Sequence, residues 1–402
     1  MNLYVTPGQL NGRLTAPPSR SYAHRYIICA ALSRGTSIIH NFVPNDDLIT
    51  TLEAMKVMGC EYSISGTELT ITGTSAELIN RLHFDCKNSL STLRILIPIS
   101  MVFSRDVIFT GTPELLEQGL SAFKEMFIKK GISVMQTSGE IHINGEFTPG
   151  RFEFPNTINR QYVSGMFFAL PRLSKNSILR VKSPIDYRSY IDMTLDALKT
   201  SGVYISELLP GIFNIKGNQS YKGSDMTLEG DWVSGANLLC YNYIGSNVTV
   251  LGLNEESLQI DKDAVSLMDK LAEGNCSINI SNYLDLGPLL FAMAAVKEGA
   301  TFTGIRKLRE KEPNRINSMI EELKAFNVKC IVSDDSIVVP KVQLKRPDMP
   351  VSSHNDSRIA MALTFLLSIT GGIMSDAEII NNHYPAFYDD LSALGLKVHY
   401  KE

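Results

Sequence analysis

One pattern recurs along this chain: an amphipathic helix that ends near a glycine is followed by a short alternating strand or hairpin. Apolar residues three or four positions apart predict the helices, and alternating apolar and polar residues predict the strands. The first three copies are TLEAMKVMG before EYSISGTELTITG, SAFKEMFIKKG before ISVMQTSGEIHING, and MTLDALKTSG before VYISELLPGIFNIKG. Any ordinary α/β chain contains single copies of this pattern. The evidence for a repeated module is therefore that the pattern recurs.

Three further copies follow in the second half of the chain. VSLMDKLAEG precedes CSINI without an evident second hairpin strand, SMIEELKAFN precedes VKCIVSDDSIVVP, and FYDDLSALG precedes VHY. Asn327 ends the second of these helices and is an acceptable left-handed cap. The helix ends recur at intervals of about 70 residues, apart from one shorter step, which is the size of a βαβαββ module. We therefore expect six such modules.

The helices between these hairpins are apolar on nearly every side. SYAHRYIICAALSRG and STLRILIPISMVF are examples, and helices of this kind lie inside a layered structure. Modules that surround buried helices with sheet, three to a lobe, predict two similar halves with a ligand site in the cleft between them.

Composition limits the partners. The chain has 402 residues, 44% of them apolar, and a net charge of -4. Nucleic acids and anionic membranes select clustered positive charge, so neither is an expected partner. Any anionic ligand must be bound by local groups. The start of the chain carries no export signal and no apolar run is long enough to span a bilayer, which favours a cytoplasmic protein.

The six cysteines are scattered singly, without a C-x-x-C pair or a histidine at metal-ligand spacing. We expect reduced, mostly buried thiols and no metal site. No Ser/His/Asp set, Cys/His set, Walker loop or G-x-G-x-x-G loop is present, and no cofactor is expected.

The segment APPSRSYAHR leads from a rigid loop into a predicted helix. Ser19 or Ser21 can cap that helix, and the free N–H groups together with Arg20 and Arg25 can hold a phosphate. A capped surface helix with solvated arginines is the alternative. Arg94 has apolar flanks, so it needs either an anionic partner or main-chain carbonyls.

Three further positions place charge near helix starts. Asp285 precedes the apolar run GPLLFAMAAV and is a candidate general base, although a lone aspartate there is more often a cap. Lys311 and Arg315 flank Glu312 in a run of mixed charge that is otherwise typical of a solvated face. Arg358 begins another apolar helix. Cations at helix starts in an acidic protein indicate a site for two substrates that carry phosphate or carboxylate groups.

Taken together, these motifs resemble the EPSP synthase family of enolpyruvyl transferases nearly from end to end. The motifs that carry the resemblance are PPSRSYAHR, STLRILIPI, QYVSGMFFALP, SYIDMTLDALK, LEGDW, SLQIDKD, LDLGPLL, LREKEPNR, SHNDSRIAMAL and NNHYPAFYDDL. The resemblance implies an α/β fold of two lobes, each an inside-out barrel of three βαβαββ units. It places one lobe at residues 1–14 and 225–402 and the other at residues 15–224, in a protein expected to be a monomer.

The resemblance also implies transfer of a carboxyvinyl group from phosphoenolpyruvate to shikimate 3-phosphate. Asp285 would take the hydroxyl proton, and Glu312 would serve proton transfer to the methylene carbon, with Arg20 at the position of a family lysine. The expected substrate-binding residues are Ser21, Arg25, Arg94, Arg160, Gln161, Tyr190, Lys311, Arg315 and Arg358.

The chain departs from the family pattern at the site itself. Arg20 stands where the family has a lysine and cannot shuttle a proton at neutral pH. The other departures are Leu90 for a glycine, Gln118 for an arginine, Asn159-Arg160 for paired serines, Tyr187 for a serine, Ser357 for a histidine and Asn382 for a lysine. Each lost charge-assisted contact is worth about 1.5–3 kcal/mol.

Three functions follow as hypotheses. The chain is an EPSP synthase, a sister transferase that acts on another phosphorylated alcohol, or a homologue that binds anions without turnover. Release of phosphate from shikimate 3-phosphate and phosphoenolpyruvate would identify an EPSP synthase. A screen of other acceptors would distinguish a sister transferase from a homologue that only binds anions.

Overall fold

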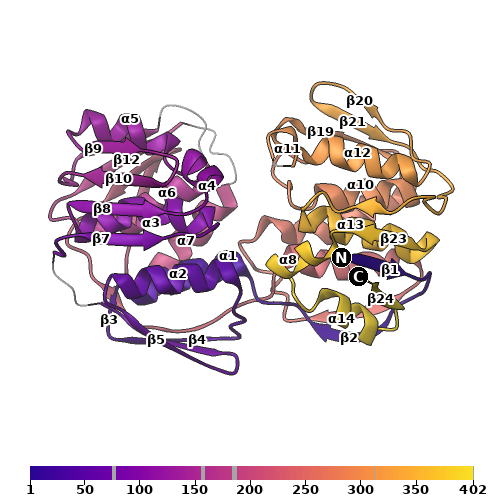
Figure 1. The fold of residues 1–402 in the computed structure, drawn as a ribbon, viewed down its shortest axis with the longest axis horizontal. Helices are drawn as coiled ribbons and strands as arrows, with labels where there is room; N and C mark the ends of the chain where they lie inside the picture. Colours follow the sequence, from indigo (N-terminus) through magenta and orange to yellow (C-terminus); the bar gives the residue numbers. More distant parts are fainter. Residues whose placement is uncertain (75–77, 155–158, 183–187, 312, 402) are drawn as a thin grey trace. The chain divides into compact units, whose positions relative to one another are not determined.

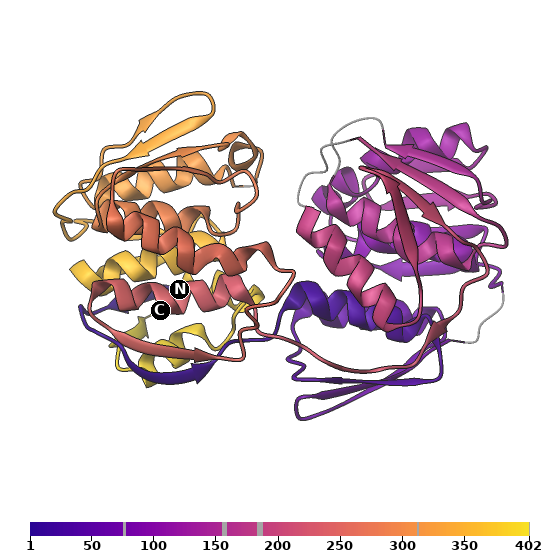
Figure 2. The ribbon, with the colours of Figure 1, turned by 180° about the vertical axis from the view of Figure 1, so that it is seen from behind.

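The computed structural model describes residues 1–74, 78–154, 159–182, 188–311 and 313–401. The chain divides into two compact units (Figures 1 and 2). The first unit comprises Met1–Pro17 and Glu229–Glu402, and the second unit comprises Pro18–Leu228. The boundaries expected after residue 14 and before residue 225 lie a few residues from these divisions.

The described residues of the second unit form three four-stranded sheets. In the first sheet the strands lie in the order β16 (Asp225–Thr227), β4 (Thr36–His40), β6 (Glu68–Thr72) and β5 (Glu61–Ser65). In the second sheet the order is β7 (Leu82–Asp85), β8 (Asp106–Thr110), β10 (Glu140–Asn144) and β9 (Ser133–Gln136). In the third sheet the order is β11 (Arg151–Phe154), β12 (Ser177–Val181), β14 (Ile212–Ile215) and β13 (Ile205–Leu209). This unit also contains a separate short parallel pair, β15 (Tyr221–Lys222) with β3 (Ser33–Arg34).

The first unit contains two sheets of four strands and one of two. In one four-stranded sheet the strands lie in the order β18 (Cys276–Asn279), β19 (Ala300–Thr303), β21 (Ser336–Val339) and β20 (Ile331–Val332). In the other the order is β22 (Val351–Ser352), β23 (Gly372–Ser375), β1 (Asn2–Val5) and β24 (Val398–Lys401). The two-stranded sheet pairs β17 (Asn247–Leu251) with β2 (Asn11–Thr15).

All five four-stranded sheets have the same construction. Two parallel strands lie side by side, and an antiparallel pair continues the sheet from the second of them, as in β7-β8-β10-β9. The strands alternate as predicted; in β10, for instance, Ile141 and Ile143 are buried and their neighbours are not. The β2-β17 sheet keeps only the parallel pair. The predicted α/β repeat is present six times, and one copy lacks its hairpin.

Two of the short strands that follow predicted helices pair outside their own copy. CSINI has no second hairpin strand after it, in line with the sequence, because β18 pairs in parallel with β19 and opens the next sheet. VHY has no hairpin partner after it, because β24 pairs with β1 from the other end of the chain. Pairing between segments so distant in sequence leaves no local pattern to read.

Three helices that are buried on nearly every side lie in the described part of each unit. They are α1 (Arg20–Ala31), α3 (Leu90–Phe103) and α6 (Arg160–Ala169) in the second unit, and α8 (Trp232–Leu239), α10 (Gly287–Val296) and α13 (Ser357–Thr370) in the first. The prediction that SYAHRYIICAALSRG and STLRILIPISMVF form inner helices is confirmed.

The remaining helices bury one side only. They are α2 (Asp46–Val57), α4 (Pro113–Gly119), α5 (Ser121–Lys129), α7 (Arg188–Thr200), α9 (Ala264–Glu273), α11 (Arg306–Arg309), α12 (Arg315–Ala325) and α14 (Phe387–Ala393), with 3-10 turns η1 (Leu170–Arg172), η2 (Cys240–Ile244), η3 (Ile260–Asp263) and η4 (Ala377–Asn382). Six predicted helix ends have positive φ, namely Gly59, Gly131, Gly202, Gly274, Asn327 and Gly395. No helix in the described ranges combines the length and the apolar character needed to cross a bilayer.

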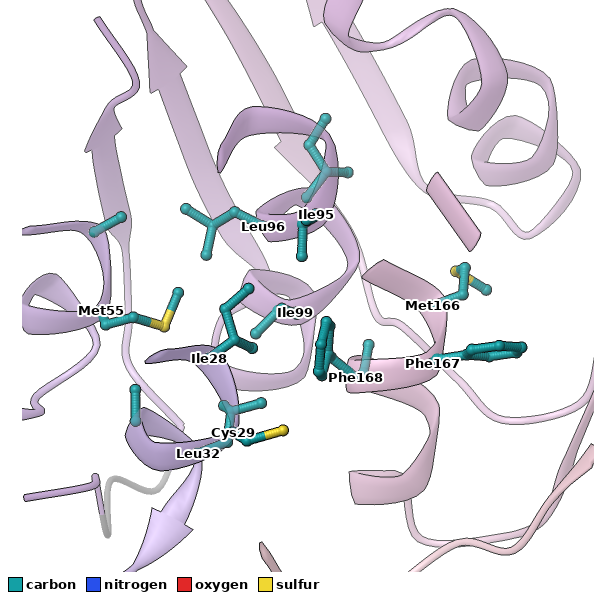
Figure 3. Close-up of a cluster of buried hydrophobic side chains, with 14 of the residues drawn as sticks. Ile28, Cys29, Leu32, Met55, Ile95, Leu96, Ile99, Met166, Phe167 and Phe168 are labelled. Carbon is teal, nitrogen blue, oxygen red and sulfur yellow. The ribbon is translucent and has the colours of Figure 1, made fainter. Parts of the chain in front are cut away.

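The core of the second unit joins α1, α2, α3 and α6 (Figure 3). Ile28 of α1, Met55 of α2, Ile99 of α3 and Phe168 of α6 are each at most 2% exposed. Burial of a large apolar side chain contributes about 1.5–3 kcal/mol. This packing fixes the positions of the helix starts, where Arg20 and Arg160 are located.

The inner helices α3 and α6 approach each other closely at Gly165 of α6. A Cβ atom there would lie 2.7 Å from the Ile95 carbonyl oxygen and 2.9 Å from Pro98 Cγ. We predict that Gly165→Ala lowers the free energy of unfolding by about 1–3 kcal/mol, although alanine is the better helix former. Urea denaturation measures this, with Gly139→Ala as the control, since a Cβ there meets nothing within 4 Å. Equal stability of the two variants would refute the tight contact.

Candidate active site

Arg25 lies on α1 and is 5% exposed. Its Nε donates to Thr194 Oγ1 (2.9 Å), its Nη1 to the Ser21 carbonyl (2.5 Å) and its Nη2 to the Tyr190 carbonyl (2.9 Å). Burial lowers the pKa of Arg25 to about 10, and the positive charge of Arg160 acts in the same direction. Arg25 therefore remains a cation at neutral pH, and it is held rigidly beside Ser21 and Tyr190.

Arg160 is the first residue of α6 and covers the ring of Tyr190. Its guanidinium carbon lies 3.5 Å from the ring centroid, whereas that of Arg25 lies 6.0 Å away. The Asn159 side chain caps α6 by accepting from the Gln161 amide (3.0 Å). Where the family has paired serines, this chain therefore has a helix cap and a guanidinium stacked on an aromatic ring.

Arg94 of α3 is bound by neutral groups. Nη1 donates to Gln161 Oε1 (3.0 Å) and Nη2 to the Gln118 carbonyl (3.2 Å), and the guanidinium carbon lies 5.2 Å from the Tyr162 centroid. Burial lowers the pKa of Arg94. An anionic partner or main-chain carbonyls were expected for Arg94, and the structure provides carbonyl oxygens. Gln118, which stands where the family pattern has an arginine, binds Arg94 through its main-chain carbonyl.

Arg20 forms an ion pair with Asp47, Nη1 to Oδ2 at 3.1 Å. His24 Nε2 lies 3.8 Å from the same carboxylate oxygen, and its Nδ1 contacts Thr51 Oγ1 at 2.9 Å. Burial would raise the pKa of Asp47, but His24 and Arg20 outweigh it and hold the pKa below the ordinary value. Asp47 and His24 were missed from sequence, although Asp47 stands in the quoted segment NDD.

The capping prediction for this helix was half right. Ser19 occupies the N-cap position of α1, but its side chain makes no cap hydrogen bond, and its Oγ has no partner among the described residues.

In the first unit, Arg315 bridges two carboxylates. Its Nη1 donates to Asp285 Oδ1 (2.8 Å) and to the Leu284 carbonyl (3.1 Å), and its Nε donates to Asp356 Oδ2 (2.6 Å). Arg315 begins α12, and Asp285 immediately precedes the N-cap of α10. Burial would lower the pKa of Arg315, but Asp356 and Asp285 raise it above the ordinary value, so its charge is permanent.

Arg358 is a buried cation with unused donors. It is 7% exposed, and Nη2 lies 3.9 Å from Asp285 Oδ2. Within the described ranges, its Nε and Nη1 have no hydrogen-bond partner. Buried donors are normally paired, so an unpaired guanidinium edge at this position is typical of a site that receives an anion.

Asp285 is an ionised carboxylate held among cations. Burial would raise its pKa, but Arg358, Arg315 and Lys311 together hold the pKa well below the usual range. With its side chain 23% exposed, Asp285 is also reachable from outside. It has the location and charge of a proton acceptor whose basicity depends on the charges around it.

The structure thus brings the predicted residues together within two sets, one in each unit. The first unit holds Asp285, Arg315, Arg358 and Lys311, and the second unit holds Arg20, Ser21, Arg25, Arg94, Arg160, Gln161 and Tyr190. Glu312 and Tyr187 lie outside the described residues. Asp356 was missed from sequence, although an aspartate directly before an apolar helix is a recognisable cap signal.

Two departures from the family pattern also have places in the structure. Ser357 is buried at the start of α13, and Leu90 is half-buried at the start of α3. Over the described ranges, no three His, Cys, Asp or Glu side chains are grouped to hold a metal ion. All six cysteines are free, and four of them are buried.

Comparisons with known proteins agree with the resemblance and with the predicted fold. The family model for EPSP synthase (3-phosphoshikimate 1-carboxyvinyltransferase) matches residues 5–391. A 3-phosphoshikimate 1-carboxyvinyltransferase of Clostridium botulinum is 33% identical, covering 98% of each chain, and one of Clostridioides difficile is 32% identical, covering 99% of this chain and 98% of the other.

Solved structures share the fold. EPSP synthase from Acinetobacter baumannii superposes with a TM-score of 0.82 at 20% identity, covering 99% of this chain and all of the other. The two-lobed α/β fold with its repeated units is therefore confirmed. With a family match over nearly its whole length, this chain belongs to the EPSP synthase family of carboxyvinyltransferases.

Proposed function

We propose that this protein is a 3-phosphoshikimate 1-carboxyvinyltransferase. It transfers the carboxyvinyl group of phosphoenolpyruvate to the 5-hydroxyl of shikimate 3-phosphate and releases phosphate. The observation that carries the proposal is the buried edge of Arg358, which has no hydrogen-bond partner among the described residues and lies beside the ionised Asp285. Relatives of similar length that bear this activity in their names support it.

The base is Asp285. The charges of Arg358, Arg315 and Lys311 lower the pKa of Asp285, which makes it a weak proton acceptor before an anionic substrate binds. Anionic substrates that bind these cations would offset their charge and raise the pKa of Asp285. Substrate binding would thereby switch on the base at the moment when the hydroxyl proton has to leave.

Phosphoenolpyruvate is assigned to Arg315 and Arg358 of the first unit. Arg358 offers Nε and Nη1 to its carboxylate or phosphate, and Arg315 is held in place by its two aspartates. Preorganised cations stabilise charge that develops during a reaction, because they need no rearrangement at that moment.

The acceptor is assigned to the second unit. Ser21, Arg25 and Gln161 are fixed by main-chain and side-chain hydrogen bonds, and Arg160 stacks on Tyr190. Arg25 and Arg160 would bind the shikimate phosphate together, and guanidinium groups are suited to this because they donate two parallel hydrogen bonds.

The steps balance as an addition followed by an elimination. The acceptor oxygen bonds to C2 of phosphoenolpyruvate while Asp285 takes the hydroxyl proton and C3 gains one. The tetrahedral adduct then loses phosphate from C2 and a proton from C3, which restores the double bond. Glu312 is assigned the proton transfers at C3, and Arg20 contributes charge only, because its guanidinium does not deprotonate at neutral pH.

A second candidate is the same chemistry on another phosphorylated alcohol. The stacked Arg160 and the Asn159 cap favour it, since both lie where the family pattern has serines for the shikimate phosphate. Its test is a screen of phosphorylated alcohols and nucleotides as acceptors. A monomeric state and a cytoplasmic location stay predictions.

We predict phosphate release from shikimate 3-phosphate plus phosphoenolpyruvate, with kcat lowered about 100-fold or more in Asp285→Asn. A coupled phosphate assay measures both, and Asp348→Asn, an exposed position in the same unit, serves as the control. Phosphate release with another acceptor alone would move the proposal to the second candidate. Tight anion binding without any turnover would identify a binding homologue instead.

We predict that Arg160→Ala weakens shikimate 3-phosphate binding about 10–150-fold, the value of one charge-assisted contact. Arg180→Ala is the matched control, because that side chain is 60% exposed and its carboxylate partner lies at 3.8 Å. Calorimetry with the acceptor alone measures the change. Equal or tighter binding by Arg160→Ala would mean that this residue covers Tyr190 without contacting the phosphate.

A further inference from the structure

Helix α12 contacts a single turn of chain through two charged side chains. Arg315 begins the helix and pairs with Asp356 (Nε to Oδ2, 2.6 Å). Glu322 lies two helical turns later on the same side and pairs with His354 (Oε1 to Nε2, 2.7 Å). The turn 353–356, which connects β22 to α13, is therefore held at both ends by α12.

This turn has an unusual backbone. His354 and Asn355 have φ values of 50° and 56°, so two consecutive residues other than glycine lie in the left-handed region. Such conformations persist only where the surroundings hold them. Ser352 Oγ accepts from the His354 amide (3.0 Å), and Ser353 Oγ accepts from the Asn355 amide (3.2 Å).

The turn ends at the residue that organises the first unit's charges. Asp356 Oδ1 caps α13 by accepting from the amides of Arg358 (2.8 Å) and Ile359 (3.4 Å), while Oδ2 holds Arg315. The position of Asp356 consequently sets the guanidinium of Arg315 directly and the main chain of Arg358 at the start of α13. A shift of the turn would move them together.

The Glu322 side chain belongs to the buried face of α12. The residue is 6% exposed, among buried Ile316, Met319 and Leu323. Burial raises the pKa of Glu322, and His354 opposes this rise. A carboxyl group is costly to bury unless it is paired, and Glu322 is paired with the side chain of His354 and the main chain of Ser352, so it contacts the chain on both sides of Ser353.

We infer that His354 and Glu322 are positioning residues of the first unit's site: they lock the turn 353–356 and, through Asp356, set Arg315 and Arg358 around Asp285. This inference rests on the proposed function for its effect on turnover, but its effect on the turn is independent of that function. Neither residue is assigned a contact with substrate.

The test compares His354→Ala with His354→Gln and with a matched control. Glutamine can still donate from its amide nitrogen to Glu322. His142→Ala is the control, because His142 pairs with Asp106 at the same Nε2–oxygen distance of 2.7 Å, with its side chain 20% exposed, in the other unit. Hydrogen exchange of the segment 353–359 and steady-state kinetics are measured on the full chain.

We predict faster exchange at the Arg358 and Ile359 amides in His354→Ala and a fall in kcat of about tenfold to a hundredfold, with the KM for the acceptor unchanged. His354→Gln restores most of both, and His142→Ala changes neither. Normal kcat in His354→Ala, or no recovery in His354→Gln, overturns the inference.

Two outcomes need separate treatment. If the wild type has no turnover, the proposed function fails, and exchange alone decides the inference: faster exchange supports the lock, and unchanged exchange overturns it. If His354→Ala does not fold, Glu322→Asp replaces it, because the shorter side chain withdraws the carboxylate from Nε2. An unchanged kcat and exchange rate in Glu322→Asp would then overturn the inference.

Discussion

The burial of six helices on nearly every side is the constraint on which the rest of this structure depends. The flanks of such helices pack mainly against apolar side chains, so the arginines of the site that lie on them stand in the first two helical turns. Arg20, Arg160 and Arg358 all lie in the first two positions of such helices. The packing that holds the core thus also determines where ligand chemistry can occur.

Charge is the second organising element, and it is arranged locally rather than across the whole protein. An acidic chain keeps its site cations in place with particular carboxylates: Asp47 holds Arg20, and Asp285 and Asp356 hold Arg315. Arg358 is different, because part of its guanidinium has no partner among the described residues. Within the charged cluster of the first unit, a cation paired with carboxylates supports the site, whereas a cation whose N–H donors have no partner among the described residues is suited to bind a ligand.

Periodicity was sufficient to predict the repeat, the inner helices and the left-handed helix ends, because these depend on neighbours in sequence. It was insufficient for β1, which pairs with β23 and β24 from the far end of the chain. The cations of the site were found as single residues, and their roles came from the family resemblance. Asp356, His354 and Glu322 were missed because their partners are 32 or 41 residues away along the sequence. A single histidine or glutamate in a sequence does not reveal which residue it pairs with.

The place of β1 has a consequence for how the molecule is made. The second unit is one continuous segment, so it can complete its fold during synthesis as soon as residue 228 has emerged. The first unit cannot, because β1 is made long before its neighbours β23 and β24. The sheet that contains β1 can therefore form only after residues 372–401 have emerged, by which time the whole second unit has been produced.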